Sequence, residues 1–134
     1  MTTTRTRYQF STSLSVDFDE AVARVTDALK AEGFGILTEI DVKATLKKKL
    51  DVDFRRYVIL GACNPPLAHK ALQADLEIGL LLPCNVIVYE ENGGSVVSIV
   101  DPIAMLGVVN NPALNEVAVA AQTRLQRVIT SLAA

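Results

Sequence analysis

The C-terminal part of the chain carries an apolar stripe with the spacing of a long α-helix. The stripe consists of Leu114, Val117, Ala118, Ala121, Leu125, Val128, Ile129 and Leu132. It follows Asn111-Pro112, a pair typical of a helix start, because proline at the first helical position loses no hydrogen bond. A helix with one apolar face must bury that face, and a helix of this length is expected to lie across a sheet.

Several upstream runs of alternating or β-branched residues predict the strands of that sheet. They cover residues 8–13, 34–42, 57–62, 86–89 and 95–100. We expect the run over 34–42 to be largely buried on one face. Asn92-Gly93-Gly94 joins the last two runs, and these residues tolerate the positive φ that a tight hairpin needs.

Helices are predicted between the strands. Asp17 and Glu20 form a capping-box pattern ahead of an apolar stripe that stops at Gly33. A short helix is expected over 42–50, and another begins at Asn64-Pro65. This order of elements predicts one α+β domain over 1–134, with a largely antiparallel sheet and helices packed on one face. The open face would then be protected by dimerisation or by a ligand.

Composition excludes some classes of function. Half of the 134 residues are hydrophobic, which suits one aliphatic core, and the formal net charge is only −2. We therefore expect no nucleic-acid partner, and we interpret Lys47-Lys48-Lys49 as a solvated helix face. The longest apolar run, 78–82, is far too short to span a membrane, and no secretory signal is recognisable, so we expect a cytoplasmic protein without a membrane partner.

Familiar catalytic motifs are missing, and the most informative stretch is 61–69. Cys63 lies where a predicted strand meets the start of a helix. One interpretation is a thiolate whose pKa is lowered by the helix N-terminus. The other is a small buried residue that ends the strand. Both interpretations fit the sequence.

A second cysteine and a single histidine extend this candidate site. Cys84 precedes a strand, so its sulfur and that of Cys63 would share a pocket if the two strands end side by side. With His69 the two cysteines would make a ligand set for a soft metal, although His69 also fits a solvent-facing helix position. Asn64 and Asp101 complete the candidate ligand-binding residues; Asp101 also fits a cap of the turn that starts at Pro102.

Several of these segments together resemble the domain of unknown function 302 family. They are 61–68, 82–86 and Asp101-Pro102, with Gly33-Phe34 and 40–43 similar too, and the resemblance runs from about Tyr8 to the last helix. It implies a fold like that of the TATA-box-binding protein, and a homodimer. It implies neither DNA binding nor a catalytic residue, because one fold hosts many functions.

Three hypotheses about function follow. The first is a non-enzymatic module that binds a small ligand or a soft metal in a cysteine-lined pocket. The second is a dimeric interaction or scaffold protein whose cysteines only pack. The third is a thiol enzyme with Cys63 as nucleophile and His69 as base. The sequence does not decide whether the protein is an enzyme, and it identifies no cofactor.

Overall fold

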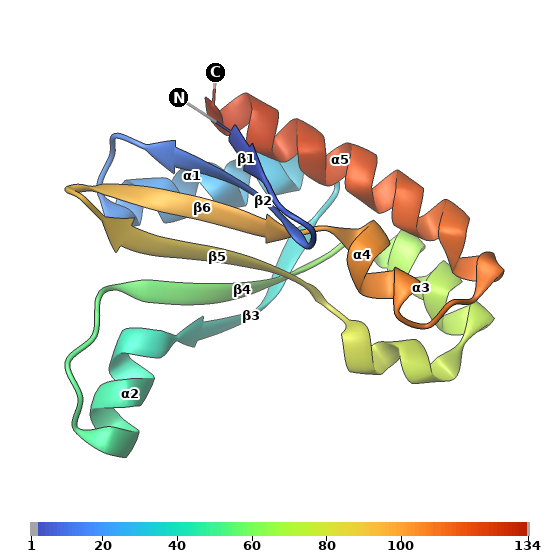
Figure 1. The fold of residues 1–134 in the computed structure, drawn as a ribbon, viewed down its shortest axis with the longest axis horizontal. Coiled ribbons are helices and arrows are strands. Elements are labelled where there is room, and N and C mark those ends of the chain that lie inside the picture. The colour runs from blue at the N-terminus through green and yellow to red at the C-terminus, as the bar shows by residue number, and fades with distance from the viewer. Residues whose placement is uncertain (1–2, 134) are drawn as a thin grey trace.

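A six-stranded antiparallel sheet organises the fold (Figure 1). The structure is a computed structural model that describes residues 3–133. The strands lie in the order β1-β2-β6-β5-β4-β3, and every neighbouring pair is antiparallel. They are β1 (Thr3–Arg5), β2 (Gln9–Leu14), β3 (Gly35–Asp41), β4 (Tyr57–Cys63), β5 (Cys84–Glu91) and β6 (Gly94–Val100).

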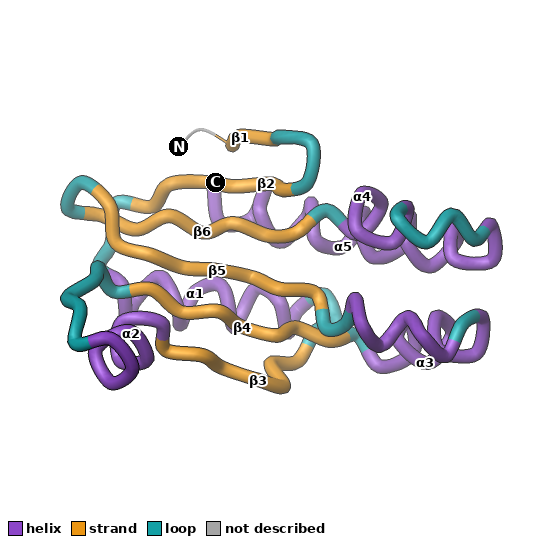
Figure 2. The backbone as a smooth tube through the Cα atoms, turned by 60° about the horizontal axis from the view of Figure 1, so that its bottom comes forward, coloured by secondary structure: helices purple, strands orange, loops and turns teal. Residues whose placement is uncertain are grey.

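Helices α1 and α5 lie behind one face of this sheet (Figure 2), so the predicted α+β class is confirmed. The helices are α1 (Phe18–Ala31), α2 (Val42–Leu50), α3 (Pro65–Ala74), α4 (Pro102–Gly107) and α5 (Asn115–Ala133), with 3₁₀ turns η1 (Leu76–Leu81) and η2 (Pro112–Leu114). Within residues 3–133, none of the helices combines the length and apolar character needed to cross a membrane.

Local signals set the ends of α1 as predicted. Asp17 is the N-cap, and its Oδ1 accepts the backbone N–H of Glu20 at 2.8 Å. The Glu20 carboxylate accepts a hydrogen bond from Arg24 Nε at 3.0 Å, one turn further along the helix. Gly33, with φ of +84°, reverses the chain after the helix, a conformation that glycine adopts without steric cost.

The core between sheet and helices is aliphatic. Val25 and Leu29 of α1 and Leu125 of α5 are completely buried, as are Val86 and Val88 of the central strand β5. Burying each such side chain stabilises the fold by roughly 1.5–3 kcal/mol. The C-terminal part of the predicted stripe, Leu125, Val128 and Ile129, therefore lies against the sheet.

Strand β3 differs from its prediction because it is an edge strand. Phe34, just before it, is 3% exposed, and Ile36 packs against the core. The rest of β3 is exposed, because this strand pairs only with β4. The following helix α2 has no buried residues of its own. The prediction that this run is largely buried on one face is therefore wrong.

Some helices and strands were not predicted from the sequence. Strand β1 contains only threonine and arginine, which carry no apolar pattern. Helix α4 spans six residues, too few to show a helical period, and begins after Asp101, whose Oδ1 accepts the N–H of Ile103 at 2.9 Å. The last helix starts with the 3₁₀ turn η2, capped by Asn111, before α5 proper.

Beyond one end of the sheet, α3, η1, α4 and the start of α5 pack together (Figures 1 and 2). They form a second apolar cluster, separate from the core under the sheet. Its buried members are Ala71, Ile78, Leu106, Leu114, Val117 and Ala118. Helix α5 contributes to both clusters, so it joins the sheet to this helical end.

The opposite sheet face has no helix packed across it within residues 3–133, apart from α2 beside the β3 edge (Figure 2). Ile40, Ile59 and Ile87 are paired in register on three adjacent strands. Next to them Tyr57 stacks on Tyr89, with ring centroids 5.5 Å apart and ring planes 9° apart. This face therefore presents apolar and aromatic side chains to solvent.

We expect Gly61→Ala to destabilise the protein. A Cβ on Gly61 in β4 would collide with Thr38 Oγ1 and lie 2.7 Å from Pro83 Cγ, whereas a Cβ on Gly35 in β3 meets no heavy atom within 4 Å. Overpacking of this kind costs about 1–3 kcal/mol. Urea unfolding of the two variants measures the difference, with Gly35→Ala as the control. Equal midpoints for both variants would contradict the packing described at Gly61.

Candidate functional site

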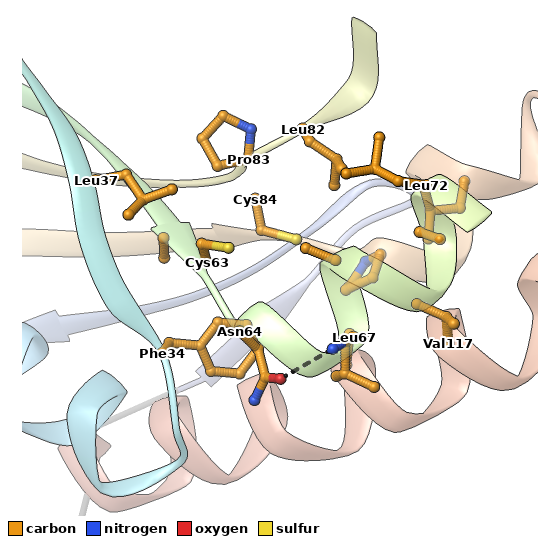
Figure 3. A pocket seen from close by; sticks show the side chains of 16 residues that line it. Phe34, Leu37, Cys63, Asn64, Leu67, Leu72, Leu82, Pro83, Cys84 and Val117 are labelled. Carbon is orange, nitrogen blue, oxygen red and sulfur yellow. Dashed lines mark hydrogen bonds between the residues drawn. The ribbon is translucent and has the colours of Figure 1, made fainter. Parts of the chain in front are cut away.

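An apolar cavity of about 270 Å³ lies between the end of the sheet and the helical end of the molecule (Figure 3). The ends of β4 and β5 and the turn before β5 form one wall. Helices α3, α4 and α5 form the other. Phe34 and Leu37 close it on the β3 side, and Leu37, which is 65% exposed, stands at the rim. The cavity therefore lies at the junction of the two apolar clusters and opens to solvent.

The cavity contains both cysteines. Cys63 is the last residue of β4 and Cys84 the first of β5, and Cys84 pairs in register with Ala62. Antiparallel pairing thus brings the two thiols to the same wall, where both are free (Figure 3). The sequence left open whether they lie close together, and strand pairing answers that question.

Both thiols have raised pKa values, which favours the interpretation of Cys63 as a small residue that ends the strand over that of a stabilised thiolate. Burial raises the pKa of Cys63, and burial together with the nearby Cys63 raises the pKa of Cys84 to about 11. An apolar wall disfavours the charged form of a thiol and so raises its pKa. At neutral pH both groups are neutral thiols.

Asn64 lines the cavity, but its side chain serves the helix. It is 7% exposed, and its Oδ1 accepts the N–H of Leu67 at 3.2 Å, which makes it the N-cap of α3 (Figure 3). The next two residues, Pro65 and Pro66, carry no N–H. The predicted cap is present, and the carbonyl oxygen of the side chain accepts the N–H of Leu67 in this role.

The metal set proposed from the sequence is not assembled. His69 is exposed on α3 and is not among the residues that line the cavity. Across residues 3–133, no three His, Cys, Asp or Glu side chains are grouped so that they could hold a metal ion. The physical reason is helical geometry: His69 points to solvent, while Ala68 and Leu72 of the same helix face the cavity.

Asp101 lies outside the cavity lining, although its neighbour Pro102 belongs to it. It is 4% exposed, and its Oδ1 accepts hydrogen bonds from Ile103 N–H and from Gln122 Nε2, the latter at 3.0 Å. Its Oδ2 lies 3.5 Å from Arg5. The carboxylate therefore caps α4 and ties it to α5 and β1, and the ligand role expected from the sequence is not supported.

Most of the cavity wall was not identified from the sequence as a site. Phe34, Leu82, Leu106 and Val117 look like ordinary core residues in their sequence patterns. The helical spacing of Leu67, Ala68, Ala71 and Leu72 predicts that they form the inner face of α3, yet Leu67 and Leu72 are only partly buried. Incomplete burial of a predicted inner face is visible only in three dimensions, so no sequence signal separates these residues from the core.

Comparison with known proteins agrees with this architecture. Among curated proteins, none matches the chain. The chain is similar to the crystal structure of an uncharacterized conserved DUF302 protein from Bacillus stearothermophilus, with 34% sequence identity and a TM-score of 0.85. That match covers 92% of this chain and 97% of the other. The family described as "Domain of unknown function DUF302" matches residues 10–132. The chain therefore belongs to the DUF302 family.

Proposed function

We propose that this domain binds a small apolar molecule in the cavity beside Cys63 and Cys84. The observation that carries the proposal is the cavity itself. Ligand sites in proteins are concave and mostly apolar, and this cavity of about 270 Å³ is lined almost entirely by apolar side chains and opens to solvent. An apolar cavity of ~150 Å³ is large enough to bind benzene. The volume here suits a molecule of about two fused aromatic rings.

The character of the wall supports binding rather than catalysis. Cys63 and Cys84 are neutral at pH 7 because burial raises the pKa of each, and His69 is exposed on the outer side of α3. A thiol nucleophile needs a base or a lowered pKa, and Cys63 has neither from these groups. The thiols act instead as small polarizable surfaces against which an apolar ligand packs.

Filling the cavity should abolish binding without unfolding the protein. Ala68 of α3 faces the cavity, whereas Ala74 of the same helix is exposed and lies outside the lining. We expect wild type and Ala74→Phe to bind naphthalene saturably in ligand-observed NMR. Ala68→Phe should show no saturable binding, while its thermal midpoint stays near that of the wild type.

Two results would contradict this proposal. One is the absence of saturable binding by benzene, indole and naphthalene to the wild-type protein. The other is binding to a folded Ala68→Phe variant that is as tight as binding to the wild type.

Thiol reactivity separates the binding module from a thiol enzyme. Two single-thiol variants allow the rate of alkylation by iodoacetamide to be measured for each thiol alone. Cys84→Ala leaves only Cys63, and Cys63→Ser leaves only Cys84. Burial is the larger cause of the raised Cys84 pKa and remains in Cys63→Ser, so the thiolate fraction of Cys84 at pH 7 should lie well below that of a free thiol. Its rate should keep rising toward pH 11. Alkylation of Cys63 faster than that of an unstructured cysteine peptide would instead support a nucleophile.

A second proposal is that two copies associate through the open sheet face. Ile40 is 48% exposed there, and Ile59 and Ile87 continue the row beside the stacked pair Tyr57 and Tyr89. Exposed apolar surface of this kind is commonly an interaction site. A two-fold axis through the face would pair this surface with itself, as a homodimer requires.

A charge on each candidate interface distinguishes the sheet face from the last helix. Ile59→Lys places an ammonium on the open face, and Val119→Lys places one on the outer side of α5, where Val119 is 54% exposed. We expect sedimentation velocity to show a dimer for wild type and Val119→Lys and a monomer for Ile59→Lys. A dimer that only Val119→Lys disrupts would locate the interface on α5, and a monomeric wild type would refute the proposal.

A further inference from the structure

We infer that the ligand of the cavity is electrically neutral as well as apolar, an inference that rests on the binding function proposed above. Within the described chain, none of the residues that line the cavity is Lys, Arg, His, Asp or Glu. A charged group that enters it loses hydration and gains no partner of opposite charge. The energetic cost of such burial is several kcal/mol, far more than a few apolar contacts return.

The N-terminus of α3, which borders the cavity, offers nothing to an anion. Helix starts usually attract anions because their first N–H groups lack partners. Here Pro65 and Pro66 have no N–H. The N–H of Leu67 is taken by Asn64 Oδ1 at 3.2 Å, and that of Ala68 by the Asn64 carbonyl at 2.9 Å. Every early donor of this helix is absent or already used.

At the start of α4, on the same side of the cavity, three of the first four positions offer no free donor. Pro102 lines the cavity and has no N–H. The N–H of Ile103 donates to the carboxylate of Asp101 at 2.9 Å, and that of Met105 donates to the Asp101 carbonyl at 3.0 Å. A negative side chain therefore occupies the place that an anionic ligand would need.

A cation finds no better partner. The two thiols are the only titratable groups among the lining residues, and at neutral pH both are protonated, because burial disfavours the thiolate. The carboxylate of Asp101 is outside the lining and already accepts hydrogen bonds from Ile103 and Gln122. The wall thus selects against both signs of charge and leaves shape and apolar area as the basis of recognition.

A matched set of probes tests the charge preference: 2-methylnaphthalene, 2-naphthoate and 2-(aminomethyl)naphthalene. They share one ring system and differ in charge at pH 7. We expect wild type to bind 2-methylnaphthalene, and to bind the two charged probes at least about 100-fold more weakly. Ligand-observed NMR with competition gives the dissociation constants, and Ala68→Phe serves as the occluded control.

A rim charge should change the selectivity in a predictable direction. Leu37 is 65% exposed at the rim of the cavity, so an arginine there does not disturb the core. Because Leu37 also lines the cavity, its loss affects the binding of both probes, so the quantity to compare is the ratio of their affinities. We expect Leu37→Arg to raise the affinity for 2-naphthoate relative to that for 2-methylnaphthalene about tenfold or more. The circular dichroism spectrum of the variant confirms that it is folded.

The outcomes separate the two proposals. If a charged probe binds the wild type as tightly as 2-methylnaphthalene and Ala68→Phe blocks it, the cavity is a ligand site but the inference of neutrality is wrong. If none of the three probes binds, or if Ala68→Phe does not affect binding, the proposed function fails and the inference fails with it.

Discussion

Helix α5 is longer than the sheet that it covers, and the rest of the structure depends on this mismatch. Its 19 residues span about 28 Å at 1.5 Å per residue. Leu125, Val128 and Ile129 pack under the sheet. Val117 and Ala118 extend beyond it and pack against α3 and α4 in the second cluster. The continuous apolar stripe of α5 thereby packs into both apolar clusters and connects them.

The cavity is a consequence of how those two cores meet. Ala62 and Cys84 on the sheet side, and Ala71 and Ala121 on the helix side, are small and cannot reach across the junction. Larger aliphatic residues, such as Leu106, sit further around the wall. The apolar wall of this open cavity forfeits dispersion contacts with other side chains, which has a cost in stability. A ligand that fills it would recover those contacts.

The same junction decides the chemistry of the cysteines. A cysteine at the end of a strand and before a helix is the usual setting of a reactive thiol. Here the helix begins with two prolines, which have no N–H, and the N–H of Leu67 donates to the side chain of Asn64, so these early positions leave no free donor for the Cys63 sulfur. The apolar wall then dominates, and the pKa of the thiol rises. Packing, rather than the sequence motif, determines the reactivity.

Sequence by itself determined the secondary structure wherever a local physical cause existed. The caps Asp17, Asn64 and Asn111 and the positive φ at Gly33 and Gly93 are properties of single residues and their neighbours. The two cysteines were also found, because they stand next to recognisable strand and helix ends. Elements too short or too polar to show an apolar period, such as the six-residue α4 and the threonine-rich β1, were missed, although the cap at Asp101 was recognised.

Only the tertiary structure decided which of the candidate residues meet. Strand pairing brought Cys84 to the wall that Cys63 occupies, while the helical rotation of α3 turned His69 to solvent. Asp101 accepts a hydrogen bond from Gln122 and contacts Arg5, so its carboxylate connects α4 to α5 and β1. These contacts form between residues that are far apart in the chain, so local sequence patterns do not predict them. A cavity in particular is a property of what surrounding side chains fail to fill.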